Sequence, residues 1–72
     1  GSINPILAHD LFGHVVNLTS QLGITFIMIE HRLQIAADYA DYVYAMIEGK
    51  IVSDGEPDQV LNDPKVIEGY LR

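Results

Sequence analysis

A short, mostly apolar run at residues 24–29 constrains the fold of this chain more than any other stretch. Gly23 precedes the run, and three charged or titratable residues at 30–32 follow it. Because most of the run is β-branched or aromatic, it predicts a buried strand. The carboxyl ends of strands carry the ligand sites of open α/β sheets, so His31 stands where chemistry is expected. The alternative is an exposed histidine that caps a loop.

The segment before this run has the pattern of an amphipathic helix. Asn4 is a favoured N-cap, and Pro5 suits the first helical position. Gly23 is placed to end the helix as a C′ residue. Apolar residues recur every three or four positions between these limits, and they predict one broad buried face; they are Leu7, Leu11, Val15, Leu18 and Leu22, with Ala8, Phe12 and Val16 beside them.

Two more strands and three short helices are predicted beyond the run. A helix at about 33–39, placed between two strands, implies a right-handed crossover and parallel pairing. Residues 42–47 and 51–53 have the pattern of an antiparallel hairpin, because Gly49 allows a tight turn between them. A helix is expected to begin at 56–58, and a last one to cover 65–71.

The predicted order is α-β-α-β-β-α-α, which makes residues 1–72 a single small α/β domain. Its sheet is expected to be the partial sheet of a three-layer fold, with two parallel strands and one antiparallel hairpin strand. So small a sheet leaves an apolar edge uncovered. We therefore expect a partner or a second copy of the chain to cover it.

The charge balance argues against nucleic acid as a partner. Four Lys and Arg stand against ten Asp and Glu, for a net charge of −6, whereas binding to a phosphate backbone needs basic side chains. The sequence holds no cysteine, so it offers no disulfide, thiolate metal site or cysteine nucleophile. No apolar run approaches the ~20 residues that cross a bilayer, and we expect no direct membrane insertion.

Two pairs of residues could be interpreted as sites. Asp10 and His14 lie four apart on one helix face, but two ligands are too few for a structural zinc site, so no metal site is predicted. Asp38 and Asp41 could form a carboxylate dyad. A helix-to-strand turn with local hydrogen bonds explains this second pair better.

Four tyrosines could stack on bases, as in proteins that bind single strands. The acidic balance of the chain instead favours their packing in the core and at interfaces. They are Tyr39, Tyr42, Tyr44 and Tyr70.

Six segments, in this order and with these gaps, resemble the ATP-binding subunits of ABC (ATP-binding cassette) transporters. The last of them resembles the subgroup that serves branched-chain amino-acid uptake. The resemblance spans nearly the whole chain and implies that it corresponds to the C-terminal part of an ABC ATPase domain. The segments are Asn4-Pro5 with the helix that follows, 23–31, 40–46, 48–52, 55–60 and 62–71.

The resemblance implies roles for two residues. His31 resembles the switch-loop histidine, which in the family contacts the γ-phosphate of ATP and holds the attacking water and the catalytic carboxylate in place. A neutral imidazole both accepts and donates a hydrogen bond, which suits this role. Residues 1–5 resemble the D-loop that crosses between two subunits, and Asn4 stands where the family more often has Asp. ATP and magnesium are the cofactors implied for the parent family.

Other parts of a nucleotide site are not found in these residues. The sequence has no G-x-x-x-x-G-K-S/T pattern, and the family's magnesium-binding aspartate, catalytic glutamate and signature helices are not matched. Phosphoryl transfer depends on such parts. We therefore expect the isolated chain to bind no cofactor and to have no autonomous ATPase activity.

Two functions stay open at this point. In the first, the chain is part of a cytoplasmic ATP-binding subunit that docks on membrane subunits and drives amino-acid uptake. In the second, it is a structural module that self-associates as a homodimer, for example by domain swapping, and is indifferent to nucleotide. Nucleotide-dependent changes around His31 would favour the first function, and a tight oligomer that ignores ATP would favour the second.

Overall fold

Helix α1, Pro5–Leu22, begins and ends where the sequence predicts. The structure is a computed structural model that describes residues 4–70. The Asn4 side-chain oxygen accepts a hydrogen bond from the Ile6 N–H at 2.8 Å, which caps the first turn. Gly23 ends the helix with a φ of 68°, a left-handed conformation that glycine adopts without steric cost.

The predicted hairpin is present. Strands β1, Val43–Ile47, and β2, Lys50–Gly55, pair antiparallel in a two-stranded sheet. Glu48 and Gly49 form the turn with φ angles of 51° and 79°, because a two-residue turn whose twist matches the strands needs positive φ at both positions. A bulge follows in β2, where Val52 is left between the paired residues Ser53 and Ile51.

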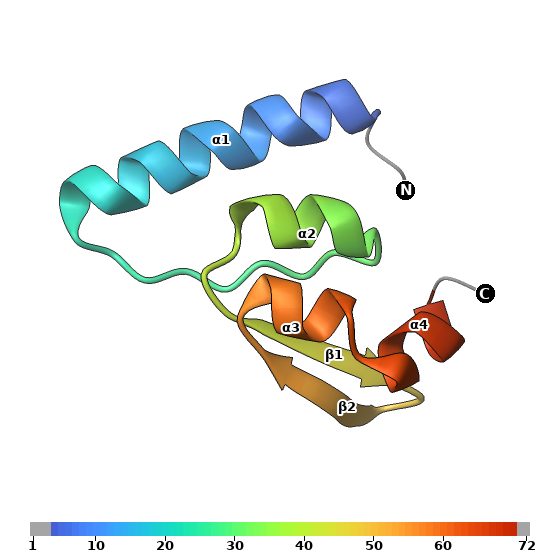
Figure 1. Cartoon of the computed structure of the whole chain (residues 1–72). Coiled ribbons are helices and arrows are strands. Elements are labelled where there is room, and N and C mark those ends of the chain that lie inside the picture. Colours follow the sequence, from blue (N-terminus) through green and yellow to red (C-terminus); the bar gives the residue numbers. More distant parts are fainter. Residues whose placement is uncertain (1–3, 71–72) are drawn as a thin grey trace.

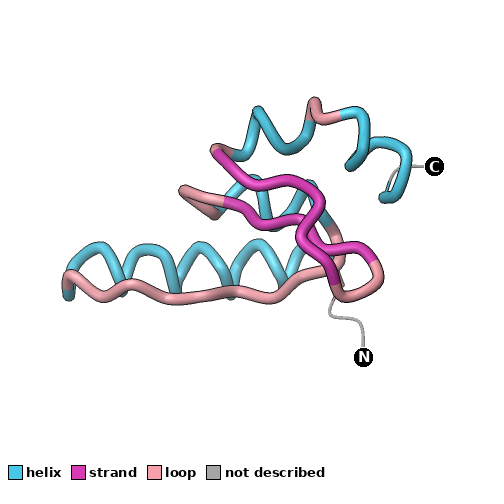
Figure 2. Tube along the Cα trace, turned by 90° about the horizontal axis from the view of Figure 1, so that it is seen from below, coloured by secondary structure: helices cyan, strands magenta, loops and turns pink. Residues whose placement is uncertain are grey.

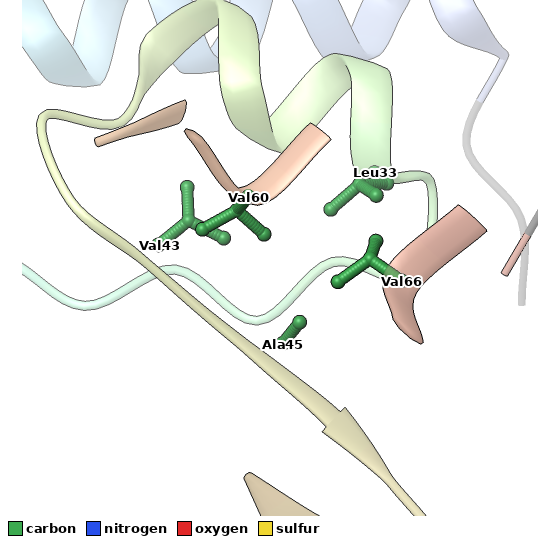
Figure 3. Packing of buried hydrophobic residues seen from close by; sticks show 5 residues of the cluster. All are labelled: Leu33, Val43, Ala45, Val60 and Val66. Atoms are coloured by element: carbon green, nitrogen blue, oxygen red, sulfur yellow. The ribbon is translucent and has the colours of Figure 1, made fainter. Parts of the chain in front are cut away.

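Three short helices complete the described chain, at positions close to those predicted. They are α2, Leu33–Tyr39, α3, Pro57–Leu61, and α4, Pro64–Tyr70. Helix α3 contacts both strands and α4 contacts β2, while α2 lies between α3 and α1 (Figure 1). Their buried side chains meet those of β1 in one core cluster (Figure 3), made of Leu33, Val43, Ala45, Val60 and Val66.

The prediction of a buried strand at 24–29, with parallel pairing, is wrong for this structure. The segment runs back beside α1 without a partner strand among residues 4–70 (Figures 1 and 2). Ile27 and Ile29 are 91% and 96% exposed, whereas Phe26 and Met28 are half-buried. The side chains thus alternate as in a strand. A strand also needs a neighbour for its backbone hydrogen bonds, and the described residues provide none.

Helix α1 buries much less of its apolar face than its pattern predicts. Ala8 is its one buried residue among the described positions. The helix rests on α2, where the Tyr39 ring lies 5.5 Å from that of His9 and 6.0 Å from that of Phe12. Its exposed side chains include Leu7, Leu11, Leu18 and Leu22. The predicted three-layer order is likewise not found, because one hairpin is the whole sheet of the described residues.

None of the helices within residues 4–70 is both long and apolar enough to cross a membrane.

Candidate functional site

His31 lies in the bend between the 24–30 segment and helix α2. Its side chain is 78% exposed, whereas that of the adjacent Glu30 is 8% exposed. Two residues further on, the Leu33 side chain is buried in the core cluster. The structure therefore places His31 on the surface, between the sheltered Glu30 and the buried Leu33. Both interpretations of the sequence allow this position.

Glu30 and Arg32 are joined by three hydrogen bonds across His31. The Arg32 backbone N–H and Nε both donate to Glu30 Oε1 at 3.0 Å. The second guanidinium nitrogen, Nη2, donates to Glu30 Oε2 at 3.1 Å. Such a two-pronged Arg–carboxylate pair is strong and geometrically specific. These bonds lower the pKa of Glu30 to about 2, and the same side-chain bond raises the pKa of Arg32.

The His31 ring also lies beside the Glu30 carboxylate. Its Nδ1 is 3.4 Å from Glu30 Oε1, which is long for a hydrogen bond but close for an electrostatic contact. A negative oxygen at this position favours a proton on Nδ1. The other ring nitrogen, Nε2, then accepts a hydrogen bond when the ring is neutral and donates one when it is protonated.

Asn4, the other predicted site residue, caps helix α1 and forms no described hydrogen bond with His31. Residues 1–3 of the predicted D-loop lie outside the described residues. The first turn of α1 and the start of α2 lie at the same end of the molecule in both views (Figures 1 and 2). The structure thus brings the two elements to one end, without a described hydrogen bond between the two predicted side chains.

All four residues of the other candidate pairs are exposed. Asp10 and His14 are both exposed on α1, and no group of three or more possible metal ligands occurs within residues 4–70. Asp38 accepts a hydrogen bond from the Gln34 side chain at 3.1 Å, in keeping with a local structural role. A hollow of about 300 Å³ lies between α1 and the 24–30 segment, with Val16 and Phe26 in its lining, and His31 is not part of it.

The hydroxyl groups of Tyr39 and Tyr42 bond residues that are distant in the sequence. The Tyr39 hydroxyl donates to the His9 carbonyl at 3.0 Å and lies 2.8 Å from His9 Nδ1. The Tyr42 hydroxyl donates to Asp54 at 2.5 Å, which raises the pKa of Tyr42. The Tyr39 contacts fit the expected packing role, whereas Tyr42 and Tyr44 are 51% and 63% exposed, with their ring centroids 5.1 Å apart.

Sequence reasoning missed the Glu30–Arg32 pair. Opposite charges two residues apart do not face each other on a helix, and on a strand they share a face. The signal was therefore present, because the pair directly follows a strand-like run. The pattern alone does not predict the bond, because it forms across the bend at His31 and depends on the conformations of both side chains.

Comparison with known proteins gives many similar sequences, two of which follow. No protein-family profile matches the sequence. The probable branched-chain amino acid transport ATP-binding protein LivG of Methanocaldococcus jannaschii is 47% identical over 73 residues, and that of Archaeoglobus fulgidus is 39% identical over 69 residues. Each alignment covers 96% of this chain but only 28% and 26% of the respective relative.

A solved structure of the same kind of protein is also similar to this chain. It is a nucleotide-free ATP-binding cassette from an ABC transporter, which matches with a TM-score of 0.77 and 47% sequence identity over 97% of this chain and 29% of that chain. The chain is homologous to part of an ABC transporter ATP-binding subunit. The resemblance noted in the sequence is thereby confirmed, and the chain spans less than a third of the length of these ABC relatives.

Proposed function

We propose that this chain is the switch-loop part of an ABC ATP-binding subunit that powers branched-chain amino-acid uptake, with His31 as the residue that faces the γ-phosphate of ATP. The names of the relatives support the transport class. The observation that supports this role is the exposure of the His31 side chain, which is 78% exposed while the backbone around it is held by the Glu30–Arg32 hydrogen bonds. An imidazole held in this way is available to a group outside the chain.

In this proposal the remaining parts of the site come from outside residues 1–72. The cofactors would be ATP and magnesium, the residues around Asn4 would act as the D-loop, and membrane subunits would be the partners on the cytoplasmic side. Residues 1–72 would then form the C-terminal part of the ATPase domain. The uncovered, strand-like segment at 24–30 supports this view, because its backbone and two exposed isoleucines are suited to a neighbouring strand.

The chain alone is expected not to hydrolyse ATP. Phosphoryl transfer is driven by positioning and by electrostatic stabilisation of the transferred group, and the sequence has no G-x-x-x-x-G-K-S/T pattern to bind that group. Incubation of the 72-residue chain with ATP and magnesium should release no phosphate above a blank. Release that is abolished in a His31→Ala variant would contradict this part of the proposal.

A hybrid cassette tests the role of His31 directly. Residues 1–72 replace the aligned segment of the Methanocaldococcus jannaschii relative, and the ATPase rate of the hybrid is measured with and without His31→Ala. We expect the substitution to lower kcat by about a hundredfold, as for other groups that position a reacting atom. The control is His14→Ala, which changes an exposed histidine on α1. Equal rates for both variants would show that His31 is not the switch residue.

A second function, self-association without nucleotide dependence, is favoured by the exposed apolar surface. Ile27 and Ile29 are almost fully exposed, and the outer face of the hairpin exposes Tyr44, Met46 and Ile51. Apolar surface of this extent usually marks an interface. Light scattering over a concentration series decides: a stable dimer that ATP leaves unchanged supports this function, and a compact monomer excludes it.

A further inference from the structure

The three hydrogen bonds between Glu30 and Arg32 close a tight loop around one residue. Two of the donors, the backbone N–H and Nε of Arg32, share Glu30 Oε1, and the guanidinium Nη2 reaches Oε2. A backbone amide bonded to a side chain two residues earlier is a turn-forming contact. The backbone on both sides of His31 is thus held by the same carboxylate. We call this pair the Glu30–Arg32 clamp.

The clamp does little for the packing of the core. The core cluster begins at Leu33 and draws its other members from β1, α3 and α4. The Glu30 side chain is sheltered at 8% exposure, yet the residue it encloses is among the more exposed of the chain. The clamp closes the loop from Glu30 to Arg32, and Leu33 anchors the C-terminal side of that loop in the core, so the backbone that carries His31 is held in one shape. An exposed side chain on a fixed backbone is the arrangement that a precise contact requires.

The geometry points to the Glu30–Arg32 clamp as the device that positions His31 and keeps a proton on its Nδ1. Glu30 and Arg32 are then positioning residues, which act on the reaction through His31. The Glu30 oxygen 3.4 Å from Nδ1 holds the ring in the Nδ1–H form. Nε2 of the neutral ring then accepts a hydrogen bond from the attacking water, and Nε2 of the protonated ring donates one to a phosphate oxygen. This inference rests on the proposed function of His31, and it assigns a role to two residues beside it.

The ring tautomer is a direct readout of the clamp. In the 72-residue chain at a pH where His31 is neutral, nitrogen-15 NMR should show Nδ1–H as the main form. In Glu30→Gln the amide can donate to Nδ1, so Nε2–H should become the main form. The control is Gln34→Ala, which removes the hydrogen bond to Asp38 on the adjacent helix and should leave the His31 tautomer unchanged. The same tautomer ratio in the unmodified chain and in Glu30→Gln would overturn the inference.

The hybrid cassette gives the second readout. Arg32→Ala keeps the backbone hydrogen bond but removes the two guanidinium bonds to Glu30, so we expect kcat to fall by about tenfold or more while KM changes less than about twofold. Arg32→Lys keeps the positive charge without the planar fork and should restore little of the rate. Gln34→Ala should behave as the unmodified hybrid.

The outcomes separate the two proposals. If His31→Ala leaves the hybrid rate unchanged, the proposed function itself is wrong. If His31→Ala lowers kcat but Arg32→Ala does not, the function stands and the clamp inference is wrong. Circular dichroism of each hybrid checks folding, and where an Arg32 variant does not fold, the NMR comparison of Glu30→Gln with the unmodified chain decides the inference.

Discussion

The hydroxyl of Tyr70 bonds both backbone groups of Met46, since it accepts from the Met46 N–H at 3.0 Å and donates to the Met46 carbonyl. Met46 lies beside the bulge of the hairpin, where the register of β1 and β2 shifts. Tyr70 is the last residue of α4. One side chain therefore joins the final helix to the irregular part of the sheet.

We expect Tyr70→Phe to destabilise the fold by about 1 kcal/mol, because it removes both hydrogen bonds at an exposed site where water can replace the hydroxyl. Urea unfolding measures the change. Tyr44→Phe is the matched control, since Tyr44 is an exposed residue of the same sheet. Equal unfolding midpoints for the two variants would contradict a structural role for the Tyr70 hydroxyl.

The hairpin turn offers a stabilising substitution. Glu48 has a φ of 51° and is exposed, in a conformation that costs most side chains roughly 1 kcal/mol. Asparagine tolerates this region better, and Asn-Gly is the preferred pair in such turns. We expect Glu48→Asn to raise the free energy of unfolding by up to about 1 kcal/mol. Glu48→Val should lower it, because a β-branched residue resists positive φ. Thermal unfolding measures the stability of both variants. A Glu48→Val variant more stable than Glu48→Asn would exclude strain at this turn.

The helix limits and the hairpin were predictable because their signals are local. Asn4, Pro5 and Gly23 mark the ends of α1, and Gly49 marks the turn, through backbone conformations that depend on the residue itself. The strand predicted at 24–29 is a different case. Its apolar alternation is a local property, but pairing needs a second strand, and the described residues hold none for it.

The candidate site was predictable in part for a similar reason. The position of His31 after an extended run follows from the order of residues, and its exposure was one of two open alternatives. The Glu30–Arg32 clamp depends on two side-chain conformations around a bend. A sequence pattern shows that the charges are present but not that both bonds of the guanidinium reach the same carboxylate.

Close packing of α4 on β1 yields a third prediction. A Cβ added at Gly69 would come 2.1 Å from Ile47 Cδ1, so Gly69→Ala requires the Ile47 side chain to move. Ile47→Val removes that methyl group. Alanine is otherwise the better helix former by about 1 kcal/mol. We therefore expect Gly69→Ala to be neutral or destabilising in the natural chain and stabilising in the Ile47→Val background.

A double-mutant cycle measures this coupling. The four proteins are compared by urea unfolding, and a favourable interaction of at least about 0.5 kcal/mol between the two substitutions is expected for residues in direct contact. If the effects of the two substitutions on the free energy of unfolding simply add, the Ile47 side chain already has room to turn away from α4.

The final prediction concerns stability at acid pH. Hydrogen bonds from Arg32 lower the pKa of Glu30 from 4.5 to about 2 in the folded chain, so the unfolded chain takes up the proton first. The stabilising contribution of Glu30 is therefore fully present above about pH 4.5 and is lost as the pH falls toward 2. Solvent screening near the surface reduces it to about 1 kcal/mol. The pKa of Asp63 is also lowered, by hydrogen bonds from the Ser53 side chain and the Lys65 amide. Asp63 therefore adds to the acid sensitivity of the chain.

Arg32→Ala separates the two carboxylates. This variant keeps Asp63 and its partners but loses the guanidinium bonds to Glu30, so its stability should fall less steeply between pH 5 and pH 2.5 than that of the unmodified chain. Urea unfolding at several pH values in this window gives the slopes, and Asp63→Asn provides the matched comparison for the other carboxylate. Parallel pH profiles for Arg32→Ala and the unmodified chain would show that the Glu30–Arg32 bonds do not persist in solution, and the clamp around His31 would lose its physical basis.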